Sequence, residues 1–180
     1  MQSYMTNLTS YNNRYYKSTT GSAASVWIRD TIQAVSLPRS LNSCSHLTIQ
    51  FSQMINANPG TTATVSLFSH SWVQSSIIAR FPGTNPSGPI TILGAHMDTI
   101  NTSNPTSGRA PGADDDGSGT VNLMEAFRVL VSNGFKPTYP VEFQWYAGEE
   151  AGLLGSNAIA TSYKSAGKQV RAMMQLDMTA

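Results

Sequence analysis

The sequence predicts an α/β fold, a three-layer sandwich in which helices flank both faces of a mixed, largely parallel central sheet. Strand and helix patterns alternate through the second half of the chain, and parallel strands separated by helices are joined by right-handed crossovers. A second observation is the short, continuous apolar run at 90–93, which is typical of a central strand buried on both faces. We expect residues 1–180 to belong to a single domain.

Three helices are predicted from apolar residues that recur every three or four positions. The first follows Gly21 and ends before Pro38, the second covers 117–132, and the third covers 153–166 and ends at Gly167. The apolar positions that share a face are Ala24, Ile28, Ile32 and Val35 in the first helix, and Leu123, Phe127 and Leu130 in the second.

The strands are predicted from alternating or β-branched and aromatic runs. Besides 90–93, these runs cover 47–54, 64–71, 76–81, 140–147 and 170–176. A turn at 58–60 and a loop rich in Gly and Pro at 82–89 separate them.

The composition excludes several classes of function. The 11 basic and 10 acidic residues nearly cancel, so nothing favours nucleic acid or a charged membrane surface as a partner. No apolar run approaches the ~20 residues of a membrane span. The start of the chain lacks the features of a signal peptide. Because only 12% of residues are charged, and because Asn7 and Asn101 begin glycosylation sequons, we nevertheless expect a secreted, extracellular protein from which the targeting segment has been removed. Cys44 is the single cysteine, so we expect either a small buried residue or a thiol whose partner lies in another segment.

Side chains that bind metals gather after the predicted strands. His96 follows the strand at 90–93, a Glu pair follows the strand at 140–147, and Asp177 follows the last strand. In open α/β sheets the carboxyl ends of parallel strands meet at one edge, where sites form. We therefore expect these side chains to converge. Mixed His and carboxylate ligands suit zinc, and a spare carboxylate suits a general base for hydrolysis.

Asp98 and the run Asp114-Asp115-Asp116 strengthen this interpretation. A carboxylate two residues after His96 can accept the second N–H of the imidazole and fix its tautomer. Three adjacent carboxylates at a helix start repel one another, and a bound dication would remove that cost. The run does not fit a calcium loop, because with Gly117 at the sixth position the twelfth is Leu123. His46 and His70 have no acidic neighbours and are interpreted as ordinary core or surface residues.

The motifs resemble those of one family of enzymes. They are GAHMD at 94–98, APGADDDGSG at 110–119, YAGEEAGL at 146–153 and QLDMT at 175–179, with NRYYKSTTG at 13–21. In these motifs the chain resembles the secreted dinuclear-zinc leucine aminopeptidases of fungi and bacteria, which are metallo-exopeptidases. The resemblance extends over essentially the whole chain.

The resemblance implies a role for each matching residue. His96 and Asp177 would bind a first zinc, Asp115 would bridge to a second, and Glu150 would bind the second. Glu149 would be the general acid/base.

The family also places a cis peptide after the bridging aspartate, which corresponds to Asp115-Asp116, and Met178 would line the apolar pocket for the first side chain of the substrate. Asp98 would orient His96. The reaction that the resemblance implies is removal of N-terminal residues, preferably leucine or other apolar ones, from peptides with a free N-terminus.

One departure concerns a second histidine ligand, which the family carries downstream of the last motif. This sequence has no His after His96, so we expect a catalytic domain that is incomplete at its C-terminal end, with two zinc ions in a complete site and one in this chain. An exposed sheet edge would then favour self-association. Two alternatives stay open: an impaired fragment that binds a metal or a partner, and a glutaminyl-cyclase-like zinc acyltransferase, against which the Glu149-Glu150 pair counts.

Overall fold

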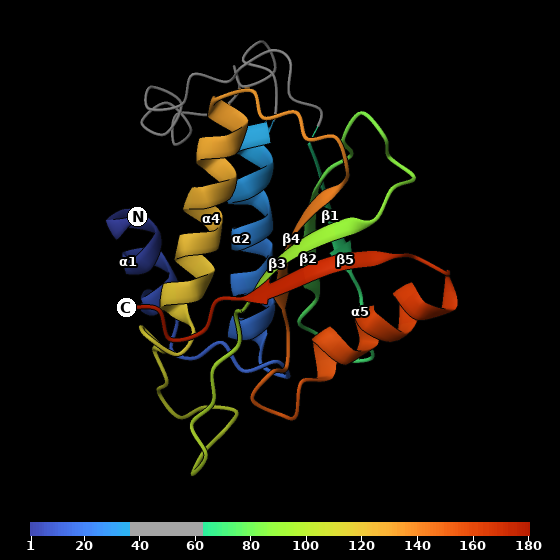
Figure 1. Ribbon diagram of the computed structural model, residues 1–180. Helices are drawn as coiled ribbons and strands as arrows, with labels where there is room; N and C mark the ends of the chain where they lie inside the picture. Colours follow the sequence, from blue (N-terminus) through green and yellow to red (C-terminus); the bar gives the residue numbers. More distant parts are fainter. Residues whose placement is uncertain (37–62) are drawn as a thin grey trace.

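The described residues, 1–36 and 63–180 of a computed structural model, build one five-stranded sheet in the order β1-β2-β4-β3-β5 (Figure 1). The strands are β1 (Thr64–Phe68), β2 (Ser76–Phe81), β3 (Ile90–His96), β4 (Val141–Tyr146) and β5 (Val170–Gln175). β3 runs parallel to both β4 and β5, whereas β2 is antiparallel to β1 and β4. The predicted mixed sheet is therefore confirmed.

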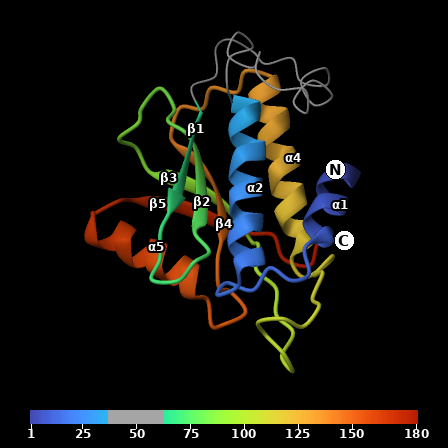
Figure 2. The same ribbon diagram turned by 180° about the vertical axis from the view of Figure 1, so that it is seen from behind.

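Helices cover both faces of this sheet. They are α1 (Gln2–Ser10), α2 (Thr19–Ser36), α4 (Gly117–Ser132) and α5 (Leu154–Ser165). α1, α2 and α4 lie on one side and α5 lies on the other, which is seen from both directions in Figures 1 and 2. None of the helices in the described ranges is long and apolar enough to cross a membrane.

The predicted elements in the described residues are confirmed, with small shifts of their ends. β1 ends earlier than the predicted run, and β3 continues to His96. α1 was not predicted, because it has neither a capping side chain nor charged residues at its ends; it is held by Tyr4 and Leu8, which are buried. The predictions for the strand at 47–54, the turn at 58–60, Pro38, Cys44 and His46 concern residues outside the described ranges.

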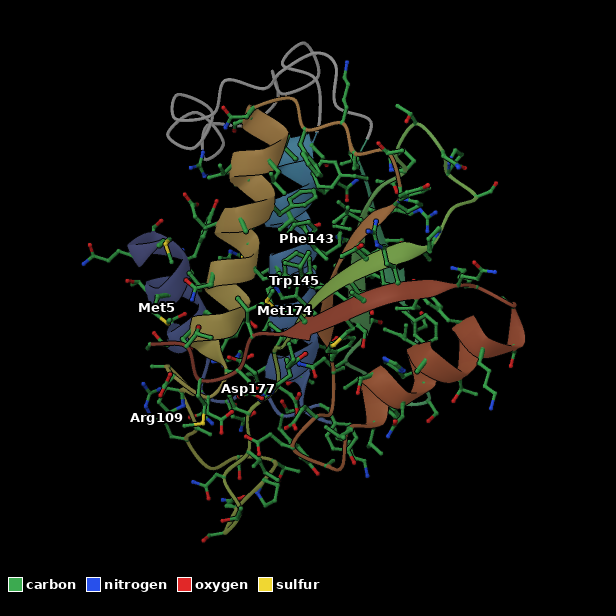
Figure 3. The ribbon with its side chains drawn as sticks, viewed as in Figure 1. Met5, Arg109, Phe143, Trp145, Met174 and Asp177 are labelled. Atoms are coloured by element: carbon green, nitrogen blue, oxygen red, sulfur yellow. The ribbon has the colours of Figure 1, made fainter. Side chains whose placement is uncertain are left out.

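The main core lies between the sheet and the layer of α2 and α4. Ile28 and Ile32 of α2 and Phe127 of α4 are buried against Phe143 and Trp145 of β4, which Figure 3 labels. The indole Nε1 of Trp145 donates to the carbonyl of Thr120 over 3.2 Å, so this large ring also fixes the start of α4.

β4 is buried on both faces. Its second face carries Glu142 and Gln144, each 1% exposed beneath α5. The Glu142 carboxylate accepts bonds from Arg80, over 2.7 Å, and from Gln144 and Tyr163, over 2.6 Å each. The alternation in the sequence therefore separates an apolar face from a buried polar network, because buried polar groups require partners.

Candidate metal centre

Three strand ends and one helix start meet around the ring of His96. Its Nε2 lies 2.9 Å from Asp115 Oδ1, 3.8 Å from Glu149 Oε2 and 4.0 Å from Asp177 Oδ2. His96 is the last residue of β3, Glu149 lies in the turn after β4, and Asp177 follows β5, where Figure 3 labels it. The convergence expected from the sequence is confirmed for these residues.

The backbone of His96 is fastened to the start of α4. Its N–H donates to Asp116 Oδ2 over 3.0 Å, and its carbonyl accepts from the hydroxyl of Thr120 over 2.8 Å. The residue is 1% exposed, so burial also restricts the movement of the imidazole. The signal for Asp116 is visible in the sequence, since an Asp before a Gly-Ser-Gly helix start is a common N-cap.

Asp98 holds the turn that carries the two glutamates. It is fully buried and accepts the backbone N–H groups of Glu149, over 2.9 Å, and Glu150, over 3.2 Å. Its Oδ1 also lies 3.5 Å from Nδ1 of His96, which is longer than an ordinary hydrogen bond. Asp98 is thus beside the imidazole, as predicted, and in addition positions the Glu149-Glu150 turn.

The three consecutive aspartates have different environments. Asp114 Oδ1 accepts from the hydroxyl of Ser118 over 3.1 Å and from the backbone of Ala180 over 3.3 Å. Asp115 leaves 48% of its side chain exposed and points at His96. Asp116 is fully buried and caps α4 by accepting from Gly119 over 2.9 Å. A cis peptide joins Asp115 to Asp116, as the family resemblance implied.

Negative charge is concentrated at the site. Burial alone would lower the pKa of His96, but the neighbouring charges of Asp98, Asp116 and Glu149 outweigh it and raise that pKa to about 9. Burial and then the charge of Asp115 raise the pKa of Glu150 to about 7.

Burial is also the main cause that raises the pKa of Glu149, followed by the repulsion of nearby carboxylates. The shared cause of these shifts is crowded negative charge, which a bound dication would neutralise in place of the imidazole proton.

The donor atoms fit zinc. His96, Asp116 and Asp177 offer ligand atoms that lie within 4.8 Å of one another, and Asp115 lies closer still to the imidazole. An imidazole nitrogen with carboxylate oxygens is a ligand set that zinc accepts. The oxygens of Asp116, however, accept three backbone N–H groups, from His96, Gly119 and Met178.

Two other residues singled out in the sequence lie differently. His70 bonds Ser76 Oγ over 2.8 Å and stacks on Trp72, with ring centroids 4.4 Å apart, which agrees with its interpretation as an ordinary residue. Met178 follows Asp177 directly, with φ of 50° and 58% of its surface exposed.

An open α/β sheet that brings a histidine and several carboxylates to the carboxyl ends of its parallel strands has the architecture of a metal-dependent enzyme. The comparisons with known proteins agree. The sequence pattern of peptidase family M28 matches residues 76–180, and the chain belongs to this family.

Relatives and solved structures extend the match. Over 183 residues the chain is 43% identical to leucine aminopeptidase 1 of Arthroderma otae, covering 99% of this chain and 44% of that protein. The crystal structure of the LapA aminopeptidase of Legionella pneumophila superposes with a TM-score of 0.78 at 30% identity, covering 99% of this chain and 42% of that one. A glutaminyl cyclase of Bacteroides thetaiotaomicron, at 19% identity, 97% and 59% coverage and a TM-score of 0.65, shares the fold. The chain thus spans less than half the length of the first two proteins.

Proposed function

We propose that the chain carries the metal-binding part of a zinc-dependent aminopeptidase, which hydrolyses N-terminal residues, preferably leucine or other apolar ones, from peptides. The observation that carries the proposal is the ring of carboxylates around His96 Nε2, with Asp115, Glu149 and Asp177 each within 4.0 Å. Family membership and the names of the fungal relatives support it.

His96, Asp115 and Asp177 would hold the first zinc, and Asp115 and Glu150 would contribute to a second. We assign the bridging position to Asp115 rather than to Asp116 because the oxygens of Asp116 already accept three backbone N–H groups. Asp115 makes its contact with the imidazole while nearly half of its side chain stays exposed, so its carboxylate has lone pairs free for metals.

A bound zinc ion supplies Lewis acidity, which acidifies water and polarises a peptide carbonyl. Glu149 lies next to the ligands without being needed as one, and burial raises the pKa of its carboxyl. Such a carboxylate accepts a proton from water near neutral pH and returns it to the leaving amine. Asp98 keeps Glu149 in place through the backbone N–H of that residue.

Glu150 and Met178 would contribute to binding of the substrate. A free N-terminal amine is a cation, and the acidic surroundings of Glu150 would attract it. Met178 would form one wall of the pocket for the first side chain. We further propose that residues 1–180 form part of one catalytic domain of an extracellular enzyme; the low content of charged residues and the exposed sequon residue Asn7 support the location.

The test is Glu149→Gln. Because the chain covers 44% of its fungal relative, the assay uses the chain alone and a chimera that adds the C-terminal part of the Arthroderma otae protein. The variant should retain the zinc content of the parent and lose about 10²–10⁴-fold in turnover of leucine p-nitroanilide. Near-normal turnover would remove Glu149 from the mechanism, and a parent that neither binds zinc nor cleaves this substrate in either form would contradict the proposed function.

A further inference from the structure

Arg14 is a fully buried arginine next to the metal centre, and none of the roles discussed above involves it. Its side chain bonds only to backbone carbonyls among the described residues. Nε donates to Met97 over 2.7 Å, Nη2 donates to Gly112 over 2.9 Å, and Nη1 donates to Pro111 and, over 3.4 Å, to Leu8. A guanidinium that is shared among carbonyls from three segments ties those segments together.

The segments it ties are those that carry the proposed ligands. Met97 lies between His96 and Asp98, at the point where β3 ends. Pro111 and Gly112 lie just before the run of three aspartates, and Gly112 O also accepts the N–H of Gly117 at the start of α4. Arg14 therefore contacts both ends of the loop that leads from His96 to Asp115.

The packing at Gly112 shows how closely these ends approach. A Cβ atom added there would lie 2.2 Å from Thr99 Cγ2, 2.5 Å from the carbonyl oxygen of Asp115 and 3.0 Å from Arg14 Nη2. The backbone of Gly112 has φ of 48°, which glycine adopts without strain. Thr99 links the same segments, because its hydroxyl accepts the backbone N–H of Arg14 and donates to the carbonyl of Ala110, over 2.8 Å each.

We propose that Arg14 is a positioning residue for the metal centre: its guanidinium fixes the distance between His96 and Asp115 by holding the carbonyls of Met97, Pro111 and Gly112 at once. The inference rests on the metal-binding role proposed above for His96 and Asp115. It makes Arg14, near the N-terminus, a supporting part of a site whose proposed ligands come from the second half of the chain.

The geometry and the charge of Arg14 act on a metal ion in opposite directions. Burial lowers the pKa of Arg14 to about 10, with Asp98 and Asp116 attracting its charge, so the residue is a cation at neutral pH. A fixed cation repels Zn²⁺, and its removal by itself would strengthen metal binding. If the guanidinium instead acts by holding the ligands in place, its removal weakens binding. The sign of the change therefore separates the two roles.

The experiment compares Arg14→Met, which removes the donors and the charge, with Arg14→Lys, which keeps the charge but not the planar fork. The matched control is Arg80→Met. Arg80 is an arginine of β2 that bonds Glu142, at the end of β4 opposite to the site. Zinc affinity is measured by competition with a chromophoric chelator, and the ligand geometry by the visible absorption of the Co²⁺-loaded protein.

We expect both Arg14 variants to bind zinc about 10–100-fold more weakly and to alter the Co²⁺ spectrum, whereas Arg80→Met loses stability without either change. Zinc binding by Arg14→Lys that equals the parent, or tighter binding by Arg14→Met, would overturn the positioning role. Hydrogen exchange of backbone amides in the zinc-free protein gives a measurement that does not depend on the metal. The N–H groups of Gly117 and His96 should exchange faster in both Arg14 variants than in Arg80→Met, and unchanged exchange would also contradict the inference. A parent chain without zinc affinity would instead count against the proposed function, and the exchange measurement would still test Arg14.

Discussion

The carboxylate of Asp116 accepts the backbone N–H of His96 over 3.0 Å. Through this bond the cap of α4 also sets the end of β3. The adjacent Asp115 places its carboxylate 2.9 Å from the ring of the same histidine. Two neighbouring aspartates thus contact different parts of one histidine: Asp116 binds the backbone of His96, and Asp115 contacts its imidazole.

Because the two aspartates have different roles, we expect their alanine variants to affect different properties, folding stability for Asp116 and zinc binding for Asp115. Asp116→Ala removes an N-cap and leaves buried N–H groups without an acceptor, so we expect it to lower the free energy of unfolding of the zinc-free chain by roughly 2–4 kcal/mol. Asp115→Ala removes a partly exposed contact, and should cost no more than about 1 kcal/mol while abolishing tight zinc binding. Urea unfolding and zinc titration of both variants check this. Retained zinc binding in Asp115→Ala, combined with its loss in a folded Asp116→Ala, would show that His96, Asp116 and Asp177 hold the metal instead.

The stoichiometry of zinc is a second prediction. His96, Asp115 and Asp177 would give one zinc three protein ligands, as many as catalytic zinc sites commonly have, whereas Glu150 and Asp115 would give the other only two. We expect calorimetry on the 180-residue chain to show about one tightly bound zinc ion. Two tight sites would mean that a further residue, such as His70 or one from a neighbouring chain, completes the second position.

Much of this arrangement could be predicted from the sequence because its signals are local. The helical spacing of Ile28 and Ile32 and the apolar run of β3 depend only on nearby residues, and the predicted helix and interior strand are both confirmed. The prediction that this strand is buried on both faces holds only in part, because Thr91 and Leu93 are half-buried. The convergence around His96 could be predicted too, because strand ends in an α/β sheet share an edge.

The contacts that hold the site together could not be predicted in this way. Arg14 bonds Met97 and Gly112 across more than eighty positions of the sequence, and no local pattern distinguishes such an arginine from an exposed one. The bonds from the turn of Glu149 and Glu150 to Asp98 likewise depend on the pairing of β3 with β4. Helix α1 has a weak pattern and forms where Tyr4 and Leu8 find a surface to cover.

The buried network beneath α5 provides a test that is separate from the metal centre. The hydroxyl of Tyr163 donates to the carboxylate of Glu142 over 2.6 Å, and Glu142 is 1% exposed. Tyr163→Phe removes this donor, so we expect a loss of about 1.5–3 kcal/mol in the free energy of unfolding. Zinc affinity should stay at the parent value, because Glu142 lies at the start of β4 and the site lies at its end. A variant as stable as the parent would show that Arg80 and Gln144 suffice to stabilise this carboxylate.

The last prediction concerns the edge of the sheet at β5. Among the described strands β5 pairs with β3 alone, and its apolar side chains Val170, Met173 and Met174 are 46%, 48% and 58% exposed. An edge with free backbone groups and exposed apolar side chains lowers its free energy by pairing with another strand. We expect the 180-residue chain to form dimers or larger species at tens of micromolar, and the chimera with the C-terminal part of the fungal relative to be monomeric. Met174→Lys, which places a charge on this edge, should shift the chain toward monomer. Val129→Lys, at a position of α4 that is 41% exposed, is the control for added charge. Light scattering measures the outcome, and a stable monomer of the unaltered chain would show that the β5 edge does not drive association.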